Sequence, residues 1–284
     1  MSEPSELSEP GDRGHRGREE LNDIERDMVL LEVDGPIAVI TNNRPDKHNA
    51  MSDEMDRRLW EVLAEVHGMN ELRAIVWRGE GRSFSSGRDT TQLGLRVEDI
   101  SDLEFIERGH RPTQMFLTMP CPIICALKGW VIGGAFERAL LCDIRVAAVG
   151  TRMMLPEVAH GVIPDSGGVA RLFQIAGHGL AADLTLTGRV LGAEEALHHG
   201  VVSRLVADET ELDSVAMEIA NKIAEAPAFT VKMARRTLFS LGAAEVQRSI
   251  AEEAVAQSLV FVSNDYAEMK SARAEGRQPA YRKR

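Results

Sequence analysis

The chain has 284 residues, of which 44% are apolar and 27% charged, and its formal net charge at pH 7 is −11. This length and composition are typical of a globular protein with a sizeable core. The negative charge argues against a general affinity for DNA, RNA or an anionic membrane surface, because their phosphates would be repelled.

The residues at the N-terminus are acidic and polar, unlike a signal peptide, and the longest apolar runs are far too short to span a bilayer. The three cysteines, Cys121, Cys125 and Cys142, do not have the number or spacing of a disulfide framework or a zinc site. We interpret them as buried thiols in a reducing compartment. We therefore expect a cytoplasmic protein with no membrane segment and no metal.

Residues 1–25 are rich in Ser, Glu, Pro, Gly and Arg and lack hydrophobic periodicity, which predicts a disordered tail. The segment 28–43 then predicts two strands joined by a turn at Asp34-Gly35. Ser52 is a candidate N-cap, apolar residues follow it at helical spacing, and Gly68 is a stop signal. These signals predict a helix between Ser52 and Gly68.

A strand over 72–77 precedes a loop rich in Gly and Ser over 78–89. A second apolar strand over 122–127 leads to Gly133-Gly134, a helical run over 135–141 and a strand over 143–148. From about Asp213 the pattern is helical to the end. Strands that alternate with helices, followed by helices alone, predict an α/β core over 26–212 and a helical C-terminal region over 213–284.

Two glycine-containing turns are candidates for chemistry, one at Ser86-Gly87 and one at Gly133-Gly134. A helix N-terminus has free N–H groups, and glycine lets a ligand atom come close to the backbone. Two such turns can aim two N–H groups at one oxygen, which is the architecture of an oxyanion hole. Ordinary strand-to-helix turns have the same glycine spacing, so both interpretations stay open.

Two glutamates accompany these turns. Glu137 precedes an apolar run, and burial there would raise its pKa and suit it to proton transfer. Glu157 follows Pro156 at a predicted strand-to-loop junction. Both side chains can instead be solvated or paired with Arg138 or Arg152.

Other motifs are excluded. No phosphate-binding GxxxxGK[ST] motif occurs, and GRSFS does not have the second glycine of a nucleophile elbow. His198 and His199 lie in a predicted helix that ends at Gly200, where capping is a better interpretation than metal binding.

Taken together, these segments resemble the enoyl-CoA hydratase/isomerase, or crotonase, family. The resemblance covers nearly the whole chain after the tail and rests on six segments in the family's order and spacing: NRPDKHNAMS, GRSFSSGRD, KGWVIGGAFERALLCDIRVA, LPEVAHGVIPDSGG, GAEEALHHGVVSRLV and FVSNDYAEMKSARAEGRQPAY. It implies a crotonase-like spiral of ββα units with a C-terminal helical trimerisation region. The protein would be a homotrimer or a dimer of trimers.

The resemblance also implies roles for particular residues. The family's two oxyanion N–H donors fall on Ser86 and Gly134, and its two hydratase acids fall on Glu137 and Glu157. Coenzyme A would be part of the substrate, with no other cofactor. Its binding segment would comprise Lys47, His48, Ala50, Ser86, Gly87, Arg88, Asp89 and Gly134, with Lys47 and Arg88 as candidates for phosphate contact.

Two further residues bear on the reaction. Asp165 adds a third carboxylate at a position that some dienoyl-CoA isomerases of the family use. Arg138 stands directly after Glu137 and would lower its pKa by pairing with it. Hydration of a 2-enoyl-CoA is the favoured hypothesis. The alternatives are isomerisation of an enoyl- or dienoyl-CoA and binding of acyl-CoA without catalysis.

Overall fold

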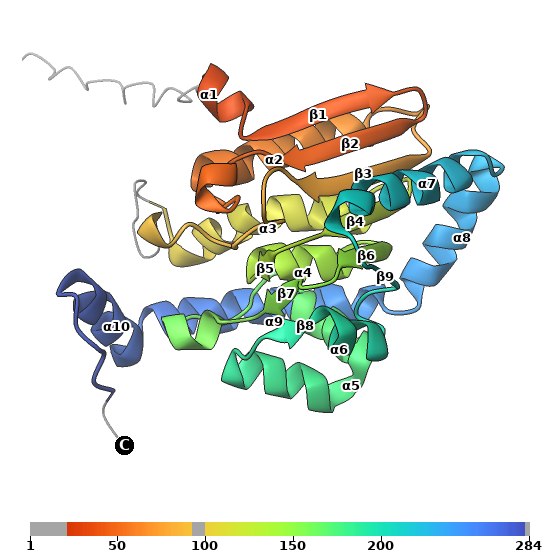
Figure 1. The fold of residues 1–284 in the computed structure, drawn as a ribbon. Helices are drawn as coiled ribbons and strands as arrows, with labels where there is room; N and C mark the ends of the chain where they lie inside the picture. The colour runs from red at the N-terminus through yellow and green to blue at the C-terminus, as the bar shows by residue number, and fades with distance from the viewer. Residues whose placement is uncertain (1–21, 93–99, 282–284) are drawn as a thin grey trace, which may run out of the picture.

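The computed structural model describes residues 22–92 and 100–281 and has a mixed α/β architecture (Figure 1). The predicted tail lies outside the described residues up to position 21. Residues 23–25, which the sequence assigns to this tail, instead lie in the short helix α1 (Asp23–Arg26), which Asn22 caps in a reciprocal pair with Glu25. The next elements, β1 (Val29–Asp34) and β2 (Ile37–Asn42), form the predicted antiparallel pair.

The larger sheet of the described residues has the strand order β1-β2-β3-β4-β6-β9, and every pairing after β1-β2 is parallel. Its further strands are β3 (Ala74–Gly79), β4 (Ile123–Leu127), β6 (Ile144–Ala148) and β9 (Arg204–Val206). A smaller sheet is formed by β5 (Trp130–Ile132), β7 (Arg152–Met154) and β8 (Leu191–Gly192). The sequence patterns predict β3, β4 and β6 but not β5, β8 or β9.

The helix α2 (Asp53–His67) begins and ends as predicted, because the Ser52 side chain accepts a hydrogen bond from Met55 N and Gly68 closes the last turn. The helix α3 (Asp102–Thr118) begins at Ser101, whose side chain accepts a hydrogen bond from Glu104 N. The remaining helices are α4 (Gly134–Leu141), α5 (Gly168–Thr187), α6 (Ala193–His198), α7 (Leu212–Ala224), α8 (Ala228–Ser240), α9 (Ala243–Phe261) and α10 (Asn264–Ala274).

The central strands of the larger sheet are buried on both faces. Alternate residues of β3 and β4 point in opposite directions: Ile75 and Trp77 join the core beneath α2 and α3, whereas Val76 and Ile124 join a second core beneath α7. Burial on both faces explains why β4 is apolar throughout. Because β2, β3, β4 and β6 run parallel, their C-terminal ends lie on the same side of the sheet. The loops that lead to the glycine turns begin there.

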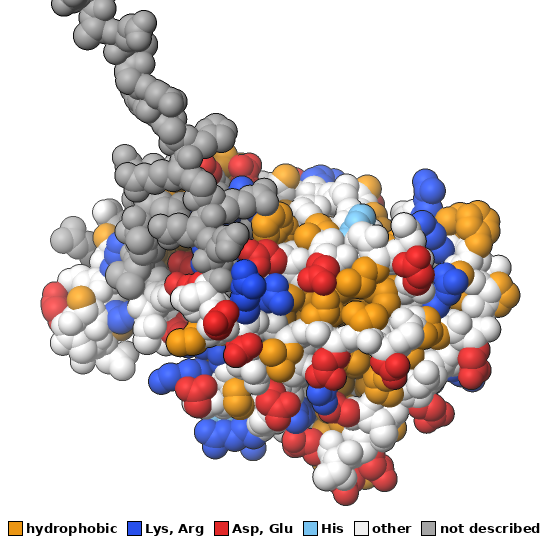
Figure 2. Space-filling view, turned by 90° about the horizontal axis from the view of Figure 1, so that it is seen from above, with side chains coloured by type: hydrophobic (Ala, Val, Ile, Leu, Met, Phe, Trp, Pro, Cys, Tyr) orange, Lys and Arg blue, Asp and Glu red, His pale blue; other side chains and the backbone are white. Residues whose placement is uncertain are grey.

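Apolar side chains are also exposed, and many of them lie on the C-terminal helices. The most exposed of these are Phe229, Leu238, Leu241, Val255, Leu259 and Val262. Figure 2, which looks down on the molecule from the β1 side, shows acidic and basic side chains interspersed with hydrophobic ones on that face.

The division of the chain into regions at residues 25 and 212 stays a prediction.

Candidate active site

The turn between β5 and α4 is shaped by Gly133. Its backbone has φ 58° and ψ −135°, a conformation that glycine adopts readily and other residues rarely do. A side chain there would also start 2.7 Å from Glu157 Oε1. The next residue, Gly134, is the first of α4, and a side chain on it would meet no atom within 4 Å. Among the described residues, no acceptor is found for the Gly134 N–H, so it faces open space at a helix N-terminus.

The loop after β3 lies against this turn. Ser85 bonds to both sides of β5, since its N–H donates to Trp130 O at 3.0 Å and its carbonyl accepts from Ile132 N at 3.0 Å. A side chain on Gly87 would start 2.6 Å from Ile132 O and 3.7 Å from Gly133 N. The two glycine turns are therefore in contact, as an oxyanion hole requires.

The Ser86 N–H does not fit the role that the resemblance implies for it. It donates to His48 O at 2.8 Å and is not free to bind a ligand. The N–H of Arg88 is better placed. Met51 N donates to Gly87 O and Asp89 N donates to Met51 O, and this parallel bridge turns the Arg88 N–H away from Met51. Among the residues the structure describes, the Arg88 N–H has no acceptor. We therefore replace Ser86 by Arg88 as the candidate donor.

Glu137 lies in the first turn of α4 and is only 1% exposed. Its carboxyl group accepts hydrogen bonds from three backbone N–H groups, those of Asp165 at 3.3 Å, Ser166 at 3.1 Å and Gly168 at 3.1 Å. The pKa of Glu137 is nevertheless raised well above its ordinary value. Burial is the largest cause, and the charge of the nearby Glu157 is the next. The raised pKa favours the protonated form of Glu137, which suits it to proton transfer.

Glu157 begins a short 3₁₀ helix, Glu157–His160, which follows β7 after Leu155 and Pro156. Its Oε1 faces Gly133, and its Oε2 is buried with no hydrogen-bond partner among the described residues. Burial raises the pKa of Glu157 to about 7. A buried carboxyl oxygen without a partner is costly and points to a ligand or water that binds during function.

Asp165 lies in the loop between that 3₁₀ helix and α5. Burial, with Glu253 as a further cause, raises the pKa of Asp165 to about 7. Glu157 and Asp165 both act on the pKa of Glu137, so the structure brings the three predicted carboxyl groups together. Arg138 does not pair with Glu137, because its guanidinium turns to Asp56 on α2 and donates to Gly109 O at 3.1 Å.

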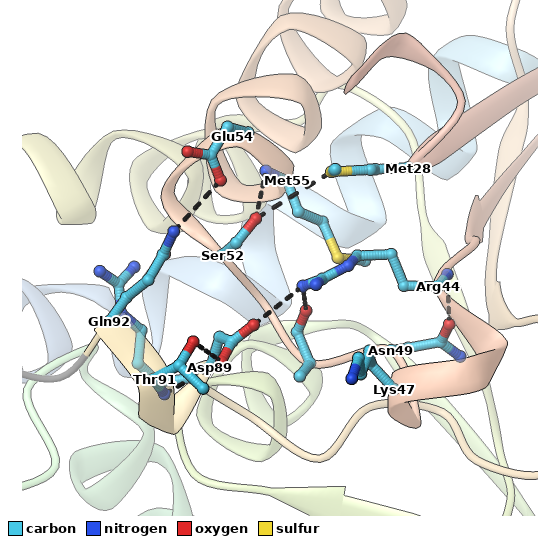
Figure 3. Close-up of polar contacts among 12 residues, drawn as sticks. Met28, Arg44, Lys47, Asn49, Ser52, Glu54, Met55, Asp89, Thr91 and Gln92 are labelled. Atoms are coloured by element: carbon cyan, nitrogen blue, oxygen red, sulfur yellow. Dashed lines mark hydrogen bonds and ion pairs between the residues drawn. The ribbon is translucent and has the colours of Figure 1, made fainter. Parts of the chain in front are cut away.

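Part of the predicted coenzyme A segment is drawn in Figure 3, where Arg44, close to Lys47 in the chain, reaches Asp89 of the loop after β3. The Arg44 guanidinium bonds Ala50 O at 2.5 Å and pairs with Asp89 at 3.3 Å, which ties the 44–50 segment to the loop after β3. His48 Nδ1 lies 2.9 Å from Ser83 Oγ in the same loop. These contacts bring the two predicted binding segments side by side.

The two candidate phosphate contacts differ. Arg88 forms an ion pair of 2.5 Å with Asp53, the first residue of α2, so its positive charge is already paired. Lys47 is exposed and forms no ion pair with the described residues. Lys47 is therefore the freer cation beside the site.

In residues 22–92 and 100–281, no group of three His, Cys, Asp or Glu side chains has the arrangement of a metal site. Over the same residues, no helix is both long and apolar enough to cross a membrane.

The candidate site thus places two candidate backbone donors beside three carboxyl groups whose pKa values burial raises. A model of the enoyl-CoA hydratase/isomerase family matches residues 32–284. The short-chain-enoyl-CoA hydratase of Clostridium acetobutylicum is 31% identical over 256 residues, which cover 90% of this chain and 97% of that protein. The 1,2-epoxyphenylacetyl-CoA isomerase of Escherichia coli is 31% identical over 258 residues, which cover 90% and 98%.

An enoyl-CoA hydratase/isomerase from Pseudoalteromonas atlantica has a crystal structure similar to this one, with a TM-score of 0.81 at 25% identity. The match covers 90% of this chain and 100% of that one. The chain belongs to the enoyl-CoA hydratase/isomerase family, and its architecture is the crotonase fold. Relatives at equal identity are named for hydration and for isomerisation, so membership defines the enzyme family and leaves the reaction open.

Proposed function

We propose that the protein is an enoyl-CoA hydratase that adds water across the double bond of a 2-enoyl-CoA. The observation that carries this proposal is the pair Glu137, which is buried, and Glu157, whose Oε2 is buried, both with a raised pKa. They accompany two backbone N–H groups that have no acceptor in the part of the chain that the structure describes. Hydration needs one group that takes a proton from water and another that gives a proton to carbon. Two carboxyl groups whose pKa values are both raised, that of Glu157 to about 7, meet this need.

In the proposed reaction, the thioester carbonyl oxygen accepts hydrogen bonds from the N–H groups of Arg88 and Gly134. These bonds strengthen as the carbonyl becomes an enolate, and each donor contributes about 3–4 kcal/mol to stabilising the transition state. Glu157 removes a proton from water while the hydroxide oxygen bonds to the β-carbon. Glu137 delivers its proton to the α-carbon, and the proton gained by Glu157 restores the pair after the product leaves.

The coenzyme A moiety would lie along the 47–50 segment and the loop after β3, where exposed Lys47 supplies a cation for a phosphate. Coenzyme A is part of the substrate, and no other cofactor enters the proposal. The acyl chain is not specified. Phe116 of α3 does not identify a pocket for it, because its ring stacks on Trp77 in the core with centroids 4.7 Å apart.

The test is turnover of 2-enoyl-CoA thioesters of increasing chain length, followed by the loss of the conjugated-thioester absorbance and by mass spectrometry of the 3-hydroxyacyl product. We expect Glu157→Gln to lower kcat by roughly 10²–10⁴-fold, the usual contribution of a general acid or base. The proposal fails if wild type and Glu157→Gln are equally inert on every chain length.

Isomerisation of an enoyl- or dienoyl-CoA is the second candidate, and Asp165 favours it. A third carboxyl group with a pKa of about 7 can move a proton along the acyl chain without adding water. Product analysis distinguishes the candidates, because an isomer has the mass of the substrate and a hydrated product is heavier by one water. A non-catalytic binder would return the thioester unchanged.

A further inference from the structure

The loop over 163–168 determines the geometry of the acids. It carries Asp165, and its backbone supplies the three N–H groups that hold the Glu137 carboxyl group. Any movement of this loop would displace both side chains. What holds the loop is therefore part of the acid machinery.

The helix α9 holds this loop at two points. Glu253 Oε2 accepts a hydrogen bond of 2.8 Å from Gly167 N, and Gln257 Oε1, one turn further on, accepts one of 2.8 Å from Ile163 N. Glu253 is itself held, since Ser249 Oγ donates to its Oε1 at 2.6 Å. The two contacts fix the loop on either side of Asp165.

Glu253 also acts on the acids by its charge. It is among the like-charged neighbours that raise the pKa of Glu137 and of Asp165. Burial raises the pKa of Glu253 itself, but the N–H of Gly167 and the hydroxyl of Ser249 both favour its ionised form.

Other charged or titratable groups face the cluster from each neighbouring element. They are Glu157 from the 3₁₀ helix, Arg138 from α4, Arg88 from the loop after β3, and His110 from α3, whose pKa is lowered by burial. The two arginines oppose the effect of Glu253 on Asp165. Both are already paired with aspartates of α2, Arg138 with Asp56 and Arg88 with Asp53, so Glu253 has no cation of its own in this set.

We propose that Glu253 is a positioning residue for the acids of this site. It anchors the loop that holds Glu137, and its negative charge sets the pH at which Glu137 and Asp165 exchange their protons. The catalytic part of this inference rests on the proposed function, whereas the titration of the carboxyl groups does not.

The substitution Glu253→Gln separates charge from anchoring. Glutamine keeps an oxygen that can accept the Gly167 N–H, and the Ser249 hydroxyl can turn to accept from the new amide. Loss of the negative charge makes it easier for the neighbouring carboxyl groups to ionise, so their pKa values fall. The basic limb of the kcat/KM profile needs protonated Glu137, so it moves to lower pH by roughly half a unit or more. The acid limb needs ionised Glu157, on which Glu253 is not among the causes of the pKa shift, so it stays in place.

The matched control is Glu252→Gln. Glu252 precedes Glu253 on α9, carries the same charge and has a side chain that is 75% exposed. We expect it to leave both limbs in place. If Glu253→Gln and Glu252→Gln give the same profile as wild type, the proposal is overturned.

A second readout does not depend on turnover. The infrared band of protonated carboxyl groups, followed against pH, should titrate at lower pH in Glu253→Gln than in wild type and Glu252→Gln. An inactive wild type would contradict the proposed hydratase function, but an unchanged band in Glu253→Gln would contradict the role of Glu253. If Glu253→Gln does not fold, Ser249→Ala removes a donor to ionised Glu253, so less of the protein carries that charge. The basic limb of kcat/KM should then move to lower pH, by less than is expected for Glu253→Gln. No shift in Ser249→Ala would then count against the proposal.

Discussion

Three carboxyl groups occupy one buried region of this protein, and their burial has a cost in stability. Glu157 has a pKa near 4.5 when unfolded and about 7 in the folded chain. Below pH 4.5 it is protonated in both the folded and the unfolded state, so its ionisation does not affect stability there. As the pH rises from about 4.5 to about 7, the unfolded chain ionises first, and the folded state loses stability relative to it.

We therefore expect Glu157→Gln to gain stability relative to wild type as the pH rises. The difference in unfolding free energy between variant and wild type should grow by about 1–3 kcal/mol from pH 5 to pH 8, because glutamine does not ionise. Denaturant unfolding at the two pH values measures it, with exposed Glu65→Gln as the control. A difference that stays constant or shrinks between pH 5 and pH 8 would contradict the raised pKa.

At the scale of elements, the start of α4 supplies one of the two candidate donors. Proline is well tolerated at the first position of a helix, and it has no N–H. Gly134→Pro should therefore keep α4 but lower kcat by about 10²–10³-fold, the usual cost of one oxyanion donor. Steady-state kinetics and far-UV circular dichroism check the two parts of this expectation.

The control is Gly134→Ala, which keeps the N–H and places a methyl group where no atom lies within 4 Å. It should retain most of the kcat that proline loses. Equal losses in both variants would show that the open space, rather than the N–H, matters at this position.

Elements with strong local signals could be predicted from the sequence, and α2 is an example because Ser52 and Gly68 mark its ends. In contrast, α3 contains Gly109 and Pro112, which disfavour a helix locally, and packing against α2 and α9 overrides them. Strands such as β5 and β8 are two or three residues long, so tertiary pairing rather than propensity determines them.

The site divides in the same way. Gly134, Glu137 and Glu157 lie in segments that the resemblance places together, and the structure brings them into one region. The choice between Ser86 and Arg88 as donor depends on bonds to His48 and Met51, more than thirty residues earlier, which no local pattern reports. Glu253 lies on another helix, far along the chain from Glu137, and its surrounding sequence reads as an ordinary amphipathic helix.

At the scale of the whole molecule, the exposed apolar side chains of the C-terminal helices predict self-association. We expect a trimer or a dimer of trimers by mass photometry. Leu241, 79% exposed between α8 and α9, and Leu259, 66% exposed on α9, are suitable positions for a charge. Leu241→Glu with Leu259→Glu should shift the population toward monomer, because burying two carboxylates opposes association.

Ile24 provides the control, since it is 76% exposed on α1, near the opposite end of the molecule from α8 (Figure 1). Ile24→Glu should leave the oligomer intact. A monomeric wild type, or an oligomer that survives both leucine substitutions, would contradict this prediction.

The helix α9 has two faces with different contacts. Glu253 and Gln257 reach inward to the loop that holds the acids, while Val255 and Leu259 lie exposed on the other side. If a neighbouring subunit covers that outer face, it holds α9 in place and with it the loop that positions the acids. Specific activity would then fall on dilution below the dissociation constant of the assembly, before any subunit unfolds.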